Sequence, residues 1–199
     1  MENYYEVDTD EFVRLCRNLK LWRDSRHLKM SVQLSCLMGN ALEELTELAR
    51  AKSAEEAIDA LCDICIYALN SKNMYSPWKI YPMDTRFADF ASQILNAVES
   101  KDIGGIVCLC FSRMVLMGYD PLKCLEQTIF EISSRTGEFD KKLGKFVKDA
   151  GFYSIEDAKQ FFPDRTIIEN SDSFDVWDDD KECFTYVKWY KANYSICGI

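Results

Sequence analysis

Two short acidic patterns constrain this chain more than any other feature. The first is Glu44-x-x-Glu47, and the second, a dozen residues later, is Asp59 with Asp63 four positions on. On α-helices, side chains three or four positions apart share one face, so the two pairs can point toward each other across a helix–helix interface. Carboxylate oxygens are ligands for Mg²⁺, Mn²⁺ or Ca²⁺ and suit softer metals much less. The patterns therefore predict two helices that meet at a divalent-metal site.

Apolar residues flank both acidic pairs and place some of the acids beside buried surface. The flanking residues are Leu42, Leu45 and Leu48 for the first pair, and Leu61, Ile64 and Ile66 for the second. A buried carboxylate without a cationic partner costs free energy. A bound metal is the simplest compensation.

Composition and charge limit the class of protein. The 199 residues can bury one sizeable core with a small appended segment. Apolar residues make up 48% of the chain and the net charge is −9, which indicates a folded protein and disfavours nucleic acid and anionic membranes as partners. The first eight residues do not form a signal peptide, and no run reaches the roughly 18 apolar residues of a membrane span. We therefore expect a cytoplasmic protein.

The cysteines and the single histidine exclude several kinds of site. Nine cysteines is an odd number, and they lie mainly in apolar helical runs, which favours packed, reduced thiols over disulfides. Cys62-x-x-Cys65 has no second pair at zinc-ribbon spacing, so core packing is the better interpretation. His27 alone cannot supply the two Glu-x-x-His helices of a di-iron bundle.

A basic segment precedes the first acidic pattern. Residues 20–29 contain four side chains that are cationic at neutral pH, together with Trp22. Taken alone, the segment is best interpreted as a solvated helix end. Its position ahead of the acidic pairs favours a site for a small polyanion instead, because a metal can bridge the acids to phosphate.

Helical periodicity dominates the first two thirds of the chain. Three helix starts carry capping signals: Thr9 or Asp10, then Ser53 with Glu56, and Asp120 before Pro121. We expect helices over about residues 9–24, 30–52, 54–70, 86–99, 105–117 and 121–135, with 71–85 as a loop. After Gly137 we expect a lysine-rich stretch over 138–148 and a short helix over 155–161. Residues 166–168 and 184–190 are expected to pair as a hairpin across the acidic turn at 178–180.

These features together resemble the all-α nucleoside triphosphate pyrophosphohydrolases, the MazG-like group that also contains dCTP pyrophosphatases and dimeric dUTPases. The resemblance covers about residues 10–70 and 118–148. It rests on Trp22, Arg26 and Gln33, on Glu44-x-x-Glu47, on Asp63 within Cys62–Tyr67, and on Gly118–Pro121 with Glu131–Arg135. The last segment is similar to the final core helix of MazG-like proteins often found in bacteriophages.

The resemblance implies a fold and an activity. The fold is an all-α, MazG-like helical bundle over 1–148, with an inserted helical pair at 71–117 and a small irregular or β-hairpin extension over 149–199 packed on it. The activity is hydrolysis of a nucleoside triphosphate to the monophosphate and pyrophosphate, with Mg²⁺, or alternatively Mn²⁺, as cofactor. A homodimer or higher homo-oligomer completes the pocket, and the location is the cytoplasm, or the host cytoplasm for a bacteriophage protein.

The site residues follow from the same resemblance. Glu44, Glu47 and Asp63 are the catalytic residues, and Asp59 joins them as a metal ligand. The expected substrate-binding residues are Trp22, Arg23, Arg26, Lys29, Gln33, Arg135, Lys141 and Lys142. For Trp22 and Gln33, packing or plain surface exposure is an equal alternative.

One position departs from the family pattern. The second acidic motif is usually Glu-x-x-Asp, and with Asp63 as its aspartate the glutamate position holds Ala60. Asp59 is the preferred replacement, since it shares a face with Asp63, and Glu56 is the alternative; fewer metals or lost activity also stay open. The rival hypotheses are a catalytically silent helical protein that binds a protein partner or a nucleotide, and an enzyme acting on another pyrophosphate such as phosphoribosyl-ATP.

Overall fold

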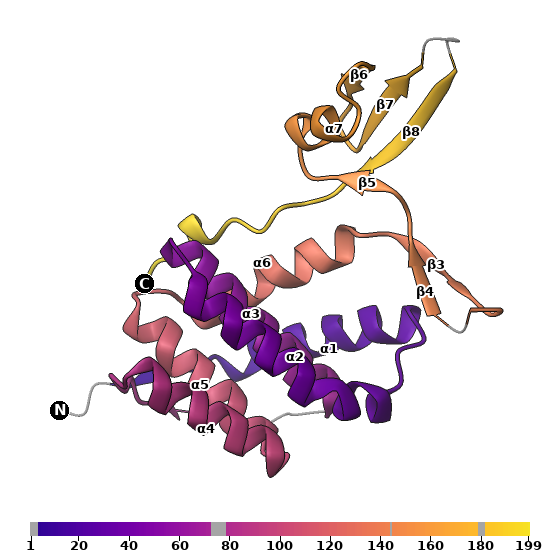
Figure 1. The fold of residues 1–199 in the computed structure, drawn as a ribbon. Helices are drawn as coiled ribbons and strands as arrows, with labels where there is room; N and C mark the ends of the chain where they lie inside the picture. Colours follow the sequence, from indigo (N-terminus) through magenta and orange to yellow (C-terminus); the bar gives the residue numbers. More distant parts are fainter. Residues whose placement is uncertain (1–3, 73–78, 144, 179–181) are drawn as a thin grey trace. The chain divides into compact units, whose positions relative to one another are not determined.

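The computed structural model of the chain describes residues 4–72, 79–143, 145–178 and 182–199 (Figure 1). They divide into two compact units. The first consists of Met1–Ile129 with Asn193–Ile199, and the second of Phe130–Ala192. The boundary expected at residue 148 lies inside the second unit.

Three α-helices begin the first unit: α1 (Thr9–Ser25), α2 (Met30–Arg50) and α3 (Ala54–Ser71). Asp8 caps α1 by accepting a hydrogen bond from the backbone N–H of Glu11, so the expected cap at Thr9 or Asp10 is wrong by a residue or two. Ser53 caps α3, as predicted. Among the described elements, α2 and α3 have the most extensive mutual contact.

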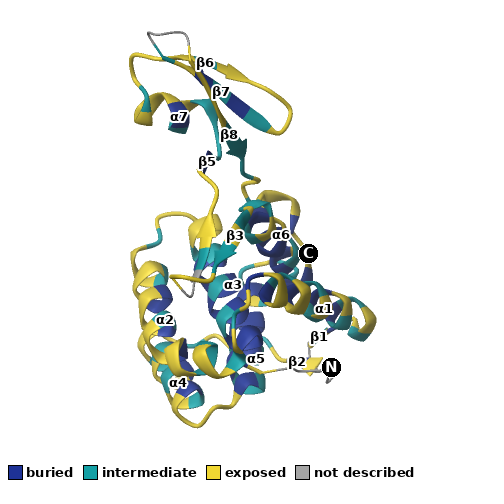
Figure 2. Ribbon diagram, turned by 90° about the vertical axis from the view of Figure 1, so that its right-hand side faces the viewer, coloured by how far each residue is buried: buried dark blue, intermediate teal, exposed yellow. Residues whose placement is uncertain are grey.

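Two further helices, α4 (Phe87–Glu99) and α5 (Ile103–Leu116), form the helical pair predicted within residues 71–117. α5 packs against α3, and α4 packs against both α2 and α5. Ile94, Ile106 and Phe111 are fully buried. Figure 2 shows buried positions along α3 and α5, so this pair contributes to the same core as the first three helices.

The sixth helix, α6 (Pro121–Ser134), begins in the first unit. Asp120 caps it, as predicted, by accepting hydrogen bonds from the backbone of Leu122 and Lys123. Two short strands, β1 (Tyr5–Glu6) and β2 (Lys79–Ile80), pair antiparallel. The 3₁₀ turn Tyr194–Ile196 belongs to the part of the chain that returns to this unit after Ala192.

The second unit is largely β-structure. A hairpin of β3 (Gly137–Asp140) and β4 (Lys145–Lys148) occupies the lysine-rich stretch. A four-stranded sheet follows in the order β5-β8-β7-β6, with β5 parallel to β8 and the other pairs antiparallel. Its elements in chain order are β5 (Gly151–Phe152), α7 (Ile155–Phe161), β6 (Thr166–Glu169), β7 (Ser173–Trp177) and β8 (Cys183–Lys188).

The expected all-α fold is therefore wrong. The described residues contain eight strands in three sheets beside seven α-helices. The short helix over 155–161 is confirmed, but the expected hairpin partner is not, because β6 pairs with β7, which lies between β6 and β8. Of the acidic turn, Asp179 and Asp180 lie outside the described residues.

An aromatic cluster lies in the second unit, with Phe174 fully buried and Phe161 at its exposed edge. The ring of Phe152 lies 5.3–6.3 Å, centre to centre, from four other rings: Phe161, Phe162, Phe174 and Tyr186. At the end of α6, the buried carboxylate of Glu131 accepts hydrogen bonds from Tyr153, Arg135 and the backbone N–H of Ala192. These contacts join the last turn of α6 to Tyr153, which follows β5, and to Ala192, the last residue of this unit.

All nine cysteines are free thiols, and Cys62 and Cys65 are fully buried, which confirms their interpretation as core residues. Among the described helices, none is both long and apolar enough to cross a membrane.

The start of α3 gives a test of the capping interpretation. Ser53 Oγ accepts from Glu56 N at 3.1 Å, and Glu56 Oε2 accepts from Lys52 N at 2.6 Å. Replacing Ser53 or Glu56 by alanine should each lower the free energy of unfolding by about 1 kcal/mol, as measured by urea denaturation. Glu55→Ala removes a charge from the same turn without a capping bond and serves as the control. An equal loss in the control would contradict the capping role.

Candidate functional site

The four predicted metal ligands lie on the two helices that pack most closely. α2 carries Glu44 and Glu47, and α3 carries Asp59 and Asp63. Glu44 is only 5% exposed, Glu47 is exposed, and the two aspartates are partly exposed. The acids thus extend from the helix interface to the surface, which would give a bound ligand access from solvent.

Glu44 is a buried acid surrounded by other acids. Its pKa is raised to about 8, first by burial and then by the negative charges of Asp63, Glu47, Glu43 and Asp59. In the described part of the chain, no cationic side chain forms an ion pair with Glu44. The protein thus keeps an uncompensated carboxyl group at this interface, which is unfavourable unless the group is protonated or meets a cation.

Tyr67 extends the acidic face of α3 by one turn, and sequence analysis missed it. Burial, followed by the charges of Asp63 and Glu44, raises the pKa of its phenol to about 12. The spacing of Asp59, Asp63 and Tyr67 was the available signal, because positions four apart share a face. A phenol at this point can donate a hydrogen bond toward the cluster.

The cluster is not a preassembled coordination shell. Among residues 4–72, 79–143, 145–178 and 182–199, no three Asp, Glu, His or Cys side chains are grouped so that they could hold a metal ion. The chemistry of the donors nonetheless fits a hard divalent cation, since all four are carboxylates and the buried Glu44 has no ion-pair partner in the part of the chain that the structure describes. Side chains would therefore have to move together on binding.

Asp59 and Glu56, the two candidates to replace a glutamate at position 60, lie in different surroundings. The Glu56 carboxylate is exposed and caps α3 through Lys52 N. Asp59 lies in the acidic cluster, where its charge contributes to the raised pKa of Glu44.

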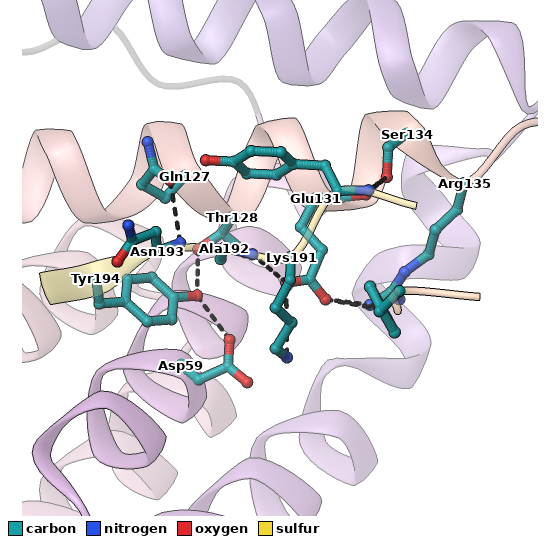
Figure 3. A network of polar contacts seen from close by, with 12 residues as sticks. Asp59, Gln127, Thr128, Glu131, Ser134, Arg135, Lys191, Ala192, Asn193 and Tyr194 are labelled. Carbon is teal, nitrogen blue, oxygen red and sulfur yellow. Dashed lines mark hydrogen bonds and ion pairs between the residues drawn. The ribbon is translucent and has the colours of Figure 1, made fainter. Parts of the chain in front are cut away.

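Asp59 has a partner from the far end of the sequence. The hydroxyl of Tyr194 donates a hydrogen bond to Asp59 Oδ1 at 2.6 Å and lies 3.0 Å from Thr128 Oγ1 (Figure 3). Tyr194 was missed because nothing in the sequence relates two residues 135 positions apart.

The expected arginines at the end of α1 are used in packing. Arg23 is 3% exposed, and its guanidinium donates to the backbone oxygen of Asn70 in the last turn of α3, where a cation is favoured by the helix dipole. Arg26 lies with its guanidinium carbon 4.6 Å from the ring centre of Trp22 and donates to the Trp22 backbone oxygen. These contacts favour a structural role for Arg23, Arg26 and Trp22.

The other expected substrate-binding residues lie elsewhere. Lys29 immediately precedes α2 and is exposed, and Gln33 is partly exposed in its first turn. Arg135 belongs to the second unit, where it bonds to Glu131. Lys141 and Lys142 are exposed in the turn between β3 and β4 of that unit.

Comparison of the chain with protein-family models, with curated proteins and with solved structures gives no match.

The raised pKa of Glu44 predicts how stability depends on pH. The unfolded carboxyl titrates near its ordinary value of 4.5 and the folded one near 8, so the folded protein binds more protons between these values. Stability should therefore fall as pH rises through this window. Glu44→Gln, which cannot ionise, should melt a few degrees higher than the unaltered protein at alkaline pH and equally near pH 4, with a chelator present.

The control for this comparison is Glu43→Gln, because Glu43 is the exposed neighbour on the same helix. It should leave most of the pH dependence in place. If Glu44→Gln retains the same fall in melting temperature, Glu44 is not the titrating group.

Proposed function

We propose that the protein hydrolyses a nucleoside triphosphate to the monophosphate and pyrophosphate in a Mg²⁺-dependent or Mn²⁺-dependent reaction. The observation that carries the proposal is the buried carboxyl group of Glu44, which forms no ion pair with a cationic side chain of the described residues. It lies in the negative field of Asp63 on the facing helix and Glu47 on its own. The order and spacing of these acids resemble those of the MazG-like pyrophosphohydrolases.

Each acid has a role in this proposal. Glu44, Glu47 and Asp63 are the catalytic residues that hold the cation, and Asp59 is the fourth ligand. The cation, when bound, supplies positive charge to the triphosphate and makes a water molecule more acidic. Loss of the Glu44 proton when the carboxyl meets a cation couples metal binding to pH.

Distances along α2 limit what its first turn can do. Gln33 lies eleven positions before Glu44, or about 16 Å at the rise of an α-helix, and Lys29 lies about 22 Å away. These spans suit contact with the base or sugar end of a nucleotide better than with a phosphate held at the cluster. Phosphate-binding cations must then come from elsewhere, and a second subunit can supply them.

The surface of α2 supports a homo-oligomer. No charged residue occurs from Met30 to Leu42, yet Val32 is 50% and Leu42 48% exposed. A long uncharged helix face that is open to solvent is typical of a protein–protein contact. A second copy of the chain, related by two-fold symmetry, would cover this face and bring its own residues toward the acidic cluster.

The substrate also bears on location. Nucleoside triphosphates are cytoplasmic metabolites, so the proposed reaction takes place in the cytoplasm, or in the host cytoplasm if the protein is encoded by a bacteriophage.

A catalytically silent binding protein is the second candidate. It is favoured by the lack of any preassembled three-ligand group among the described residues and by Ala60 at the usual glutamate position. Phe161, which is 70% exposed in the second unit, would suit a protein contact.

The activity can be tested with a panel of nucleoside triphosphates, assayed for pyrophosphate release with and without Mg²⁺. Glu47→Gln and Asp63→Asn should each reduce turnover by at least about 100-fold, because each removes ligand charge while preserving shape. Melting temperatures should not fall, since each change relieves repulsion among the acids. Glu55→Gln, an exposed acid at the start of α3, is the control and should keep full activity. An active, metal-independent Asp63→Asn variant would refute the proposal.

The oligomer can be tested by sedimentation velocity at micromolar concentration. The unaltered chain should sediment as a dimer or larger species, and Val32→Glu should shift it toward the monomer, because it places a charge on the uncharged face of α2. Leu21→Glu makes the same change at an exposed position of α1 and should not dissociate the oligomer. A strict monomer with full activity would contradict this assignment.

A further inference from the structure

Several hydrogen bonds hold the segment Asn193–Ile199 against the rest of the first unit. Asn193 N donates to Gln127 Oε1 at 3.1 Å, Asp120 N donates to the oxygen of Cys197 at 2.7 Å, and Ile199 N donates to the oxygen of Gly118 at 3.0 Å. These bonds place the segment beside α6 and the turn before it. The side chain of Tyr194 is 4% exposed as a result.

The single proton of the Tyr194 hydroxyl is donated to Asp59. A phenol carries one proton, and the 2.6 Å contact with Asp59 Oδ1 uses it because a carboxylate can only accept. Thr128 Oγ1, which lies 3.0 Å from the Tyr194 oxygen, donates its own proton to the backbone oxygen of Cys124 at 3.1 Å. Tyr194 thus delivers one buried donor to one oxygen of the Asp59 carboxylate (Figure 3).

This bond restricts the rotation of the Asp59 side chain. No described residue donates a hydrogen bond to the second oxygen, Oδ2. A carboxylate held by one oxygen keeps the other in a defined direction, as is usual for metal-ligating carboxylates that are hydrogen-bonded by neighbouring groups.

We propose that Tyr194 is a positioning residue of the acidic site: its hydroxyl orients Asp59, so that the segment after the second unit sets the affinity of the site for a divalent cation. This inference rests on the proposed function. The rival explanation is that the bond only anchors the segment, in which case it contributes to stability and not to metal binding.

The chain contains a matched control for this distinction. Tyr5 also donates its hydroxyl to a carboxylate, Asp120 Oδ1, at 2.9 Å, and this bond too lies within the first unit. Asp120 caps α6 and is not among the proposed ligands. Tyr5→Phe therefore removes an equivalent tyrosine–aspartate bond from a purely structural position.

The experiment measures Mn²⁺ binding by electron paramagnetic resonance on the full chain without nucleotide, alongside the melting temperature. Tyr194→Phe should weaken Mn²⁺ binding by about tenfold or more, whereas Tyr5→Phe should lower stability without changing the affinity. In an Asp59→Asn background, Tyr194→Phe should have no further effect on affinity, because it acts through Asp59. If Tyr194→Phe loses its fold, Thr128→Val replaces it: this change removes the other hydroxyl in contact with the Tyr194 oxygen at nearly constant shape and should weaken binding in the same direction.

The outcomes separate the two proposals. An unaltered protein that binds Mn²⁺ and releases pyrophosphate, with a Tyr194→Phe variant of equal affinity, overturns only the positioning role. The positioning role is overturned as well if Tyr194→Phe costs the same affinity in the unaltered chain and in the Asp59→Asn background. If the unaltered protein neither binds Mn²⁺ nor hydrolyses any triphosphate, the proposed function fails and this inference fails with it.

Discussion

The packing of α2 against α3 is the interaction on which the candidate site depends. It buries Glu44 while leaving Glu47 exposed and the two aspartates of α3 partly exposed. The same interface is extended by α4 on α2 and α5 on α3, so the acids are held by the core of the first unit. Acids that repel one another reduce stability, and a fold that keeps them together at its best-packed interface must gain elsewhere. Binding of a cation is the gain we propose.

The helices could be predicted from the sequence because their signals are local. Ser53 and the Asp120-Pro121 pair mark helix starts through bonds to residues two or three positions away, and apolar periodicity marks the buried faces. In the second unit, the strands expected at 166–168 and 184–190 overlap β6 and β8, but β7 between them was not predicted. β7 contains only two buried residues, Phe174 and Val176, and the polar Asp175 lies between them. The expected all-α fold came from the resemblance, which covers about residues 10–70 and 118–148 and therefore only the start of this unit.

The site was predictable in part for the same reason. Spacing alone put Glu44 and Glu47 on one face of a helix, but it could not distinguish an arginine that binds phosphate from one that packs. Arg23 is such a case, because its partner is a backbone oxygen at the end of another helix. Tyr194 lay beyond any local pattern, since its contact with Asp59 depends on the return of the chain to the first unit.

That return has a consequence for how the protein folds during synthesis. The first unit is assembled from two stretches of chain, and Phe130–Ala192 must be translated between them. The helices α1 to α5 can pack early because their contacts are close in sequence. The hydrogen bond between Tyr194 and Asp59 can form only after the whole second unit has been synthesised. The nascent chain therefore contains a folded helical core with an unfinished acidic site.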